Sequence, residues 1–401
     1  MKQSKLDFIR QNAPCYLYDK EQIMHRCQAL RNAMPEVQFL YSVKANPFTQ
    51  VVQAVAAQGF GADAASPSEV LLAERSCVPH SRIFYSAPGK TRNDIEKAWS
   101  KCTIIADSLS ELALLEEHAA AEGTECCVGI RVNPNFTMSG AVSMPSKFGI
   151  DEDQLFCADL CFPHLKITGI HVHLQSQVLD TDLLCAYYRN CYKHAERMNA
   201  LDNVNVQFIN FGSGIGTVYD TEMEHPLMLD KISSTVTELY EQNRCGLHAQ
   251  FLFETGRFIV CNAGTYYTRI VDRKISHGKT YLIVQNAMNG FLRPAIAELL
   301  RQNLNGFPAH GQEPLFTSGK QCNFSILGRS GELETVDLVG NLCTALDVLA
   351  KDIVLPRADI GDIIAISNAG SYGYTLSPQG FSSHETPKQF LWTESINEQH
   401  I

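Results

Sequence analysis

Residues 37–46 read VQFLYSVKAN, a strand-length run of β-branched, aromatic and aliphatic residues that ends near a lysine. This run is the first of eight between residues 37 and 257, and amphipathic stretches separate most of them. The eight predicted strands are 37–43, 59–64, 82–86, 103–106, 126–132, 167–174, 206–211 and 250–254.

Two of the intervening stretches carry clear helix signals. SPSE at 66–69 has a capping residue and a proline in the first turn, and DS at 107–108 leads into an apolar-striped run that ends at Gly123. Eight such βα units predict an α/β chain with a (β/α)8 barrel of the TIM type, which typically takes about 250 residues. A doubly wound sheet stays open as the alternative, because a count of strands does not show closure.

The sequence changes character after residue 262. Segments such as TYYTRIVDRK, KTYLIVQN and GELETVDLVG are typical of strands joined by turns, and they predict a mostly antiparallel β domain. The opening PCYLYDKEQI is typical of a strand that runs into a helix. We therefore expect residues 1–30 to join the β domain, residues 31–262 to form the barrel and residues 263–401 to form the β domain.

Composition limits the possible functions. A chain of 401 residues suggests about two domains, and a formal net charge of −10 disfavours a general nucleic-acid binder. The polar start MKQSKLDFIRQNAP lacks a signal peptide, and no run approaches the ~18 apolar residues of a membrane span. The 14 cysteines show neither CxxC nor zinc spacing. We expect a cytoplasmic protein with reduced thiols, no metal and a small-molecule substrate.

Polar residues follow the predicted strands at the ends where a β/α barrel gathers its reactive groups. Glycine N–H groups bind anions, and barrels often hold a phosphate after strands seven and eight, where GSGIG at 212–216 falls with Arg257 nearby. A tight turn is the plainer explanation of this loop, because GxGxG alone is a weak signal. The other strand-end residues are Lys44, Asp63, Arg131, His171, His173, Ser176 and Glu254.

A lysine at the end of a buried strand is costly as an unpaired ammonium but tolerable as a neutral amine or a Schiff base. With a phosphate cradle and a carboxylate, Lys44 suits pyridoxal phosphate: Glu254 would pair with the ring nitrogen and His173 would stack on the ring. Taken singly, these residues are more often a surface lysine, a core histidine and half of an ion pair. Because all of these residues fall at the ends of predicted barrel strands, their combination favours the functional interpretation.

The ordered motifs YSVKAN, HVHLQSQ, GSGIG, ETGR, GNLCTALDVLAKD and GSYGY resemble those of the fold-type III pyridoxal-phosphate decarboxylases. That group includes diaminopimelate, ornithine and arginine decarboxylases, and its barrel is of the alanine-racemase type. The resemblance spans nearly the whole chain and implies that Lys44 is the Schiff-base lysine. The cofactor contacts that it implies are Lys44, Asp63, Arg131, His173, Ser176, Gly212, Gly214, Gly216, Glu254, Arg257 and Tyr372.

The resemblance also assigns a role to Cys343. In this family the corresponding cysteine enters the site from the other subunit and protonates Cα after carbon dioxide leaves. It implies a homodimer with shared active sites and a catalytic set of Lys44, His173, Glu254 and Cys343. A buried thiol at a strand end is the plainer explanation of Cys343.

The sequence departs from the family where the substrate is recognised. Diaminopimelate and ornithine decarboxylases carry an acid after the cysteine, but Thr344 stands here, and Asn286 occupies a second acidic position. Losing a charge-assisted hydrogen bond of about 1.5–3 kcal/mol weakens the recognition of a distal ammonium. Arg293 is retained and could bind a carboxylate. We therefore predict an amino-acid conjugate, such as a citrate-linked siderophore intermediate, with diaminopimelate as the alternative substrate.

Two other functions stay open. An amino-acid racemase could use the same fold, although racemases of this type usually place arginine against the ring nitrogen, where this chain has Glu254. A non-catalytic relative that binds a partner would typically lose the lysine, the phosphate glycines or the cysteine, and this chain retains all three.

Overall fold

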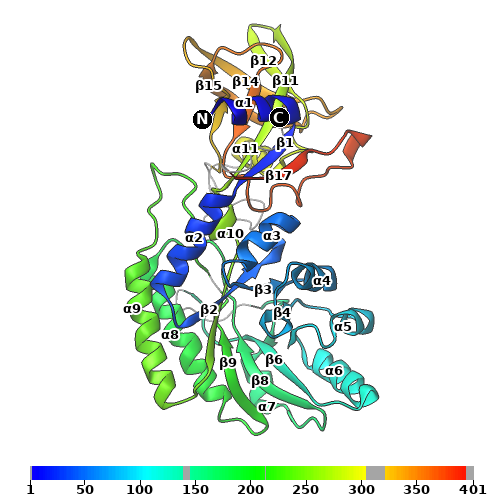
Figure 1. Ribbon diagram of the computed structural model, residues 1–401, viewed down its shortest axis with the longest axis vertical. Helices are drawn as coiled ribbons and strands as arrows, with labels where there is room; N and C mark the ends of the chain where they lie inside the picture. Colours follow the sequence, from blue (N-terminus) through cyan, green and yellow to red (C-terminus); the bar gives the residue numbers. More distant parts are fainter. Residues whose placement is uncertain (1, 139–144, 213, 304–320, 394–401) are drawn as a thin grey trace. The chain divides into compact units, whose positions relative to one another are not determined.

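The computed structural model describes residues 2–138, 145–212, 214–303 and 321–393 (Figure 1). The chain divides into two compact units. The barrel unit comprises Met24–Gly216 and Pro226–Gly256, and the β unit comprises Met1–Ile23, Thr217–His225 and Arg257–Ile401. The domain limits expected from the sequence, at residues 30 and 262, stay a prediction.

Eight parallel strands close the barrel unit. They follow the order β5-β4-β3-β2-β10-β9-β8-β6, and pairing of β5 with β6 completes the ring. The predicted (β/α)8 barrel is confirmed, and a doubly wound sheet is excluded because an open sheet has two free edges. The strands are β2 (Val37–Ser42), β3 (Gly61–Ala64), β4 (Ile83–Ser86), β5 (Thr103–Ala106), β6 (Cys126–Asn133), β8 (Leu165–His171), β9 (Val204–Asn210) and β10 (Gln250–Thr255), with the short β7 (Ile150–Asp151) beside β6.

Helices follow these strands, and Figure 1 shows α4, α5, α6, α8 and α9 on the outside of the strands. Ser66 caps α4 by accepting a hydrogen bond from Glu69 N, and Ser108 caps α6, which ends at Gly123 with φ +64°. The helices that the unit contains or shares are α2 (Lys20–Ala33), α3 (Thr49–Ala56), α4 (Pro67–Arg75), α5 (Arg92–Ala98), α6 (Leu109–Glu122), α7 (Glu152–Cys157), α8 (Thr181–Met198) and α9 (Leu229–Cys245), with 3-10 turns η1 (Val43–Ala45) and η2 (His80–Arg82).

An apolar cluster fills part of the barrel interior. It joins one residue from each of five strands: Leu40, Phe84, Ile105, Phe208 and Leu252. Phe208 fits because glycine stands opposite it on β8, where a Cβ at position 169 would lie only 1.9 Å from the ring. This packed layer gives the polar residues at the strand ends a rigid support.

The β unit is built on an eight-stranded, mostly antiparallel sheet, as predicted. Its order is β13-β16-β11-β12-β14-β15, and β1 pairs with both β11 and β17. The pairs β12–β14 and β1–β17 are parallel. Its elements are α1 (Gln3–Asn12), β1 (Cys15–Asp19), α10 (Arg257–Val260), β11 (Gly264–Ser276), β12 (Lys279–Val284), α11 (Leu292–Asn303), β13 (Phe324–Ile326), β14 (Leu333–Gly340), β15 (Val348–Pro356), β16 (Ile363–Ile366), η3 (Phe381–Ser383) and β17 (Lys388–Trp392).

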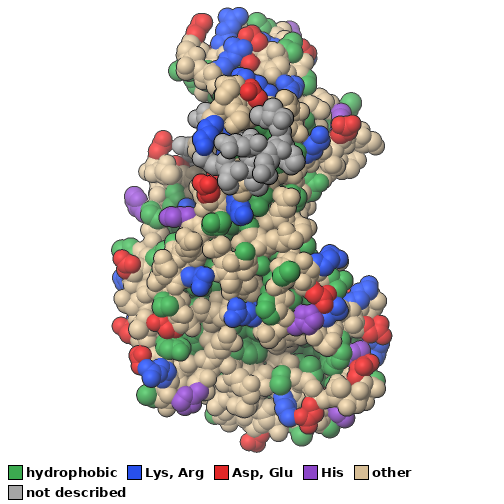
Figure 2. All heavy atoms as spheres, viewed as in Figure 1, with side chains coloured by type: hydrophobic (Ala, Val, Ile, Leu, Met, Phe, Trp, Pro, Cys, Tyr) green, Lys and Arg blue, Asp and Glu red, His purple; other side chains and the backbone are tan. Residues whose placement is uncertain are grey.

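The visible surface mixes both signs of charge. In the view of Figure 2, Lys and Arg side chains are interspersed with Asp and Glu side chains. Within the described parts of the chain, no helix combines the length and the apolar character needed to cross a bilayer.

Candidate active site

Lys44 lies at the end of β2, in the turn η1, beside the last part of β3. Its Nζ is 3.2 Å from Asp63 Oδ2, and the pairing of Ser42 with Asp63 in the sheet sets this approach. The lysine side chain is 43 % exposed, whereas the Asp63 side chain is fully buried. The sequence suggested a buried lysine amine; the structure instead leaves the amine accessible and balances its charge with a carboxylate.

Asp63 is held in its ionised form. Burial by itself would raise its pKa, but the Lys44 ammonium and a hydrogen bond from Ser86 outweigh burial and hold the pKa below its ordinary value. Ser86 Oγ donates to Asp63 Oδ1 at 2.7 Å. Ser86 ends β4, so three adjacent strand ends meet at this carboxylate.

Glu254 is a buried acid at the end of β10. Its Oε1 accepts a hydrogen bond from Asn210 Nδ2 at 2.8 Å, and His171 Nε2 lies 3.2 Å from the same oxygen without the alignment of a hydrogen bond. Burial, helped by the nearby Asp63 carboxylate, raises the pKa of Glu254 to about 7. Burial also lowers the pKa of His171 well below its ordinary value, so this imidazole is neutral.

His173 and Ser176 follow β8. His173 Nε2 lies 3.2 Å from Ser176 Oγ, and burial lowers the pKa of His173 to about 3. The ring is therefore neutral and suits stacking on an electron-poor aromatic ring without charge repulsion. Its Nδ1 is buried and has no hydrogen-bond partner among the described residues.

The glycine positions of the turn leave no room for a side chain. Gly212 and Gly214 have φ of +57° and +74°, in the left-handed region that favours glycine. A Cβ at Gly212 would lie 2.5 Å from His173 Nδ1, and one at Gly214 would lie 2.7 Å from Leu184 Cδ2. Gly212 N donates to Asn210 Oδ1 at 2.9 Å and Gly216 N donates to a backbone carbonyl, so these two N–H groups hold the shape of the turn.

Arg131 lies near the end of β6 and is buried. Its guanidinium lies over the ring of Phe148 at 4.5 Å, and its Nη1 is 3.7 Å from Asp107 Oδ1. The other oxygen of Asp107 accepts a hydrogen bond from Gly149 N at 3.0 Å. Asp107 thus connects Arg131 to the SKFGI segment at 146–150.

In the β unit, two buried guanidinium groups surround Tyr219. Arg257 Nη1 donates to the Tyr219 hydroxyl at 2.6 Å and lies over the ring of Tyr372 at 5.0 Å. Arg293 lies over the Tyr219 ring at 5.1 Å and donates to Ser371 O at 3.1 Å. Its side chain is only 1 % exposed, which is unusual for arginine.

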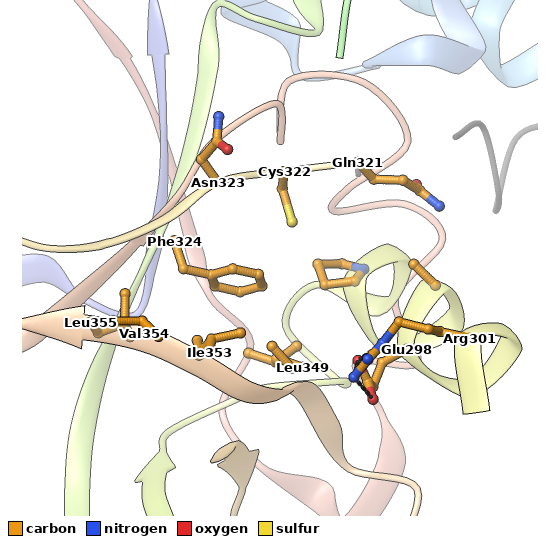
Figure 3. Close-up of a pocket in the computed structure, with 13 residues that line it drawn as sticks. Glu298, Arg301, Gln321, Cys322, Asn323, Phe324, Leu349, Ile353, Val354 and Leu355 are labelled. Carbon is orange, nitrogen blue, oxygen red and sulfur yellow. Dashed lines mark hydrogen bonds and ion pairs between the residues drawn. The ribbon is translucent and has the colours of Figure 1, made fainter. Parts of the chain in front are cut away.

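A cavity of about 380 Å³ opens beside α11 in the same unit (Figure 3). Cys322 directs its sulfur and Phe324 its ring toward this cavity, and Glu298 pairs with Arg301 at its side. Gln321 also lines it and accepts a hydrogen bond from Arg293 Nη2 at 3.0 Å.

Three more predicted site residues lie in the β unit: Cys343, expected to protonate Cα, and Thr344 and Asn286, expected to recognise the substrate with Arg293. Cys343 is exposed and Thr344 is half-buried in the loop between β14 and β15. Asp347 holds this loop, because its carboxylate accepts hydrogen bonds from Leu342 N at 2.9 Å and Met288 N at 2.8 Å. Asn286 is buried and donates from its side-chain amide to Glu385 O.

Among the residues of these clusters that were not assigned a role from the sequence are Ser86, Asn210 and Tyr219. Asn210 ends a strand two residues before Gly212, and Ser86 also ends a strand, so both carried the same signal as the residues that were selected. Tyr219 lies outside any helix or strand and offered no comparable signal.

The barrel residues fit the pyridoxal phosphate that the resemblance implies. An accessible amine stands beside a buried carboxylate, a neutral imidazole has an Nδ1 without a hydrogen-bond partner among the described residues, and the glycine positions of the turn have no room for a side chain. In the described ranges, no group of three or more His, Cys, Asp and Glu side chains is arranged to hold a metal ion.

Comparisons with known proteins agree with this fit. Residues 20–261 match the family model described as the pyridoxal-binding domain of pyridoxal-dependent decarboxylases. A relative from Niallia circulans, L-glutamyl-(BtrI acyl-carrier protein) decarboxylase, is 31 % identical over 95 % of this chain and 89 % of its own length. A Staphylococcus aureus relative, 2-((L-alanin-3-ylcarbamoyl)methyl)-2-hydroxybutanedioate decarboxylase, is 28 % identical over 95 % of this chain and 94 % of its own.

The fold is shared with a solved structure as well. The crystal structure of a point mutant of diaminopimelate decarboxylase from Helicobacter pylori, complexed with L-lysine, is 26 % identical and has a TM-score of 0.80. The alignment covers 96 % of this chain and 93 % of that one.

Proposed function

The chain belongs to the pyridoxal-dependent decarboxylases and uses pyridoxal phosphate, and on this premise we propose that it decarboxylates an amino-acid conjugate that carries additional carboxylates. The observation that carries the cofactor assignment is the meeting of Lys44, Asp63, Glu254 and the glycine turn at the carboxyl ends of the barrel strands. The proposed substrate class rests on the sequence, because the uncharged Thr344 stands where diaminopimelate and ornithine decarboxylases carry an acid.

When bound, pyridoxal phosphate supplies an electron sink for the bond that breaks at Cα. Lys44 would attach it covalently, and Asp63 would hold the lysine amine in place. Glu254 would face the ring nitrogen, where a cationic neighbour lowers the pKa of a buried carboxyl and favours its ionised form. His173, being neutral, would cover one ring face.

The remaining cofactor contacts are proposals of the same kind. Gly212 and Gly216 would set the shape of the phosphate turn, Gly214 would let the backbone approach the phosphate, and Ser176 would add a hydroxyl donor. Arg131, Arg257 and Tyr372 are assigned to the cofactor by the resemblance.

We propose that the Cys343 thiol holds the proton that Cα receives after carbon dioxide leaves. Its exposure on a loop anchored by Asp347 suits a group that acts on a substrate bound by another subunit. This role requires a homodimer with shared active sites.

The substrate proposal depends on the loss of charge beside Cys343. Thr344 can offer only a hydroxyl, so it does not compensate a distal ammonium, whereas Arg293 would suit a distal carboxylate. The names of the Niallia circulans and Staphylococcus aureus relatives both describe an amino acid joined to a larger group. Diaminopimelate is the second candidate, because the Helicobacter pylori enzyme is similar over nearly its whole length.

The cellular setting is also proposed. We place the protein in the cytoplasm, with residues 31–262 as the cofactor-binding domain and residues 263–401, joined by residues 1–30, as the β domain.

A carbon dioxide release assay tests the substrate. Purified protein with added pyridoxal phosphate is compared on a citryl-amino-acid conjugate, diaminopimelate and ornithine at equal concentrations. We expect the conjugate to give the highest kcat/KM. A strong preference for diaminopimelate would reject the conjugate, and racemisation without carbon dioxide release would reject decarboxylation of the compounds tested.

A further inference from the structure

We propose that Asn210 is a positioning residue that ties the glycine turn at 212–216 to the carboxylate of Glu254. The inference rests on the proposed role of both groups as cofactor contacts. Asn210 touches neither substrate nor a reacting atom in this scheme; it acts through Glu254 and Gly212.

A closed ring of three hydrogen bonds connects these residues. Glu254 N donates to Gly212 O at 2.7 Å, Gly212 N donates to Asn210 Oδ1 at 2.9 Å, and Asn210 Nδ2 donates to Glu254 Oε1 at 2.8 Å. The amide oxygen of Asn210 faces a donor and the amide nitrogen faces an acceptor, because a backbone N–H can only donate and a carboxylate can only accept. The orientation of the amide is therefore fixed by its surroundings.

The sheet register brings these side chains together. Asn210 pairs with Leu252 of β10 and with His171 of β8. Side chains two residues apart on a strand share a face, so Asn210 and Glu254 point to the same side of the barrel wall. Asn210 is completely buried and Glu254 is 3 % exposed, so water does not compete for the bonds between them.

This arrangement couples two sites that a single cofactor would use. The acid that faces the ring nitrogen cannot shift along β10 without moving Gly212, because backbone and side-chain bonds both connect them. A ligand with an anionic group at one end and an aromatic nitrogen at the other would therefore meet a fixed spacing. Of the three bonds in the ring, loss of Asn210 would leave only the backbone bond from Glu254 N to Gly212 O, so the Glu254 carboxylate itself would no longer be tied to the turn.

The test is a double-mutant cycle read by cofactor affinity. The dissociation constant for pyridoxal phosphate is measured for wild type, Asn210→Ala, Glu254→Gln and the double variant, starting from apo-protein. We expect each single change to raise the dissociation constant about tenfold or more, as for the loss of a hydrogen bond to a charged group. If Asn210 acts through Glu254, the double variant should exceed the worse single variant by no more than about threefold.

Asn243→Ala is the matched control. Asn243 is also buried in the barrel unit, and its side-chain amide also both donates and accepts: Nδ2 donates to Ala249 O at 2.7 Å, and Oδ1 accepts from Ala249 N at 2.9 Å. It lies near the end of α9, however, and not at a strand end. We expect this variant to lower the melting temperature without changing cofactor affinity. An equal loss of affinity in Asn243→Ala would overturn the proposal, because it would show that general loosening of the barrel is sufficient.

Asn210→Asp provides a second measurement if the alanine variant does not fold. The aspartate keeps an acceptor for Gly212 N but places a second carboxylate beside Glu254, and two neighbouring carboxylates do not ionise independently. We expect the pH at which the cofactor absorbance changes to rise by about one unit or more, while affinity falls less than in Glu254→Gln.

The outcomes separate this inference from the proposed function. Two results would overturn the role of Asn210 alone. In the first, the factors by which the two single changes raise the dissociation constant multiply in the double variant. In the second, Asn210→Ala leaves cofactor affinity unchanged and Asn210→Asp leaves the pH profile unchanged. Unchanged affinity and absorbance in both Glu254→Gln and Lys44→Ala would overturn the cofactor site itself.

Discussion

Replacing Glu254 by glutamine should remove a pH-dependent destabilisation of the apo-protein. Burial raises the pKa of Glu254 from 4.5 to about 7. A carboxyl group whose pKa is higher in the folded state than in the unfolded state does not lower the free energy of unfolding at low pH, because it is protonated in both states. It destabilises the fold as pH rises from the unfolded pKa to the folded pKa, and the cost is constant above that.

The size of this destabilisation follows from the interval between the unfolded and the folded pKa values. At about 1.36 kcal/mol for each pH unit, the destabilisation that builds up between pH 5 and pH 8 is about 2.5 kcal/mol. Glutamine has the same shape, keeps an oxygen for Asn210 Nδ2 and does not ionise. The stability advantage of Glu254→Gln over wild type should therefore grow by about 2.5 kcal/mol across this range.

Equilibrium urea unfolding of both apo-proteins at pH 5, 6, 7 and 8 measures the difference. Subtracting one protein from the other removes the titration of every group that they share. Glu238→Gln is the control, because Glu238 is an exposed carboxylate of the same unit, with its side chain 62 % exposed. A difference between Glu254→Gln and wild type that is the same at pH 5 and pH 8 would show that the acid is not held neutral by burial.

Three further outcomes are expected. Lys44→Ala should abolish the absorbance of the lysine-bound cofactor near the visible edge while leaving the fold intact, because the lysine side chain is 43 % exposed and the ion pair with Asp63 lies at a strand end; an unchanged spectrum would contradict the assignment. Cys343→Ala should keep the cofactor spectrum but slow turnover by about tenfold or more, in line with the ~10²–10⁴-fold typical of general acids; full activity in carbon dioxide release would remove Cys343 from its role. Gly214→Ala should weaken cofactor binding in a titration of apo-protein, since its φ of +74° and the 2.7 Å approach to Leu184 leave no place for a methyl group; wild-type affinity would show that the turn can relax.

The barrel was predictable because its signals are local. Each strand is a short apolar run, and the capping serines Ser66 and Ser108 stand where α4 and α6 begin. Closure was not predictable in the same way. It depends on β5 pairing with β6, through Ile105 beside Gly129, and nothing in either segment distinguishes an edge strand from a closed ring.

Candidate site residues could be selected from the sequence where they stand at the ends of predicted strands. Lys44, Asp63 and Glu254 could be selected because a barrel brings the carboxyl ends of all its strands to one mouth. Which of them meet is decided by register, and the sequence does not state register. The pairing of Ser42 with Asp63 gives Lys44 its carboxylate, and the pairing of Leu252 with Asn210 gives Glu254 its amide. Their roles in catalysis stay predictions.

Asn286 shows why an uncharged residue need not signal a change of substrate. Its side-chain amide donates to Glu385 O, and its backbone carbonyl accepts from the Tyr266 hydroxyl at 2.6 Å. An ionised aspartate at this position could not donate, and its oxygen would face the carbonyl of residue 385. The structure of this chain therefore needs an amide at 286 whatever the substrate is. Thr344 shows no such requirement within the described residues, since its hydroxyl accepts from Leu346 N at 3.3 Å, which an aspartate could also do. The inference from lost charge to a substrate without a distal ammonium is accordingly carried by Thr344.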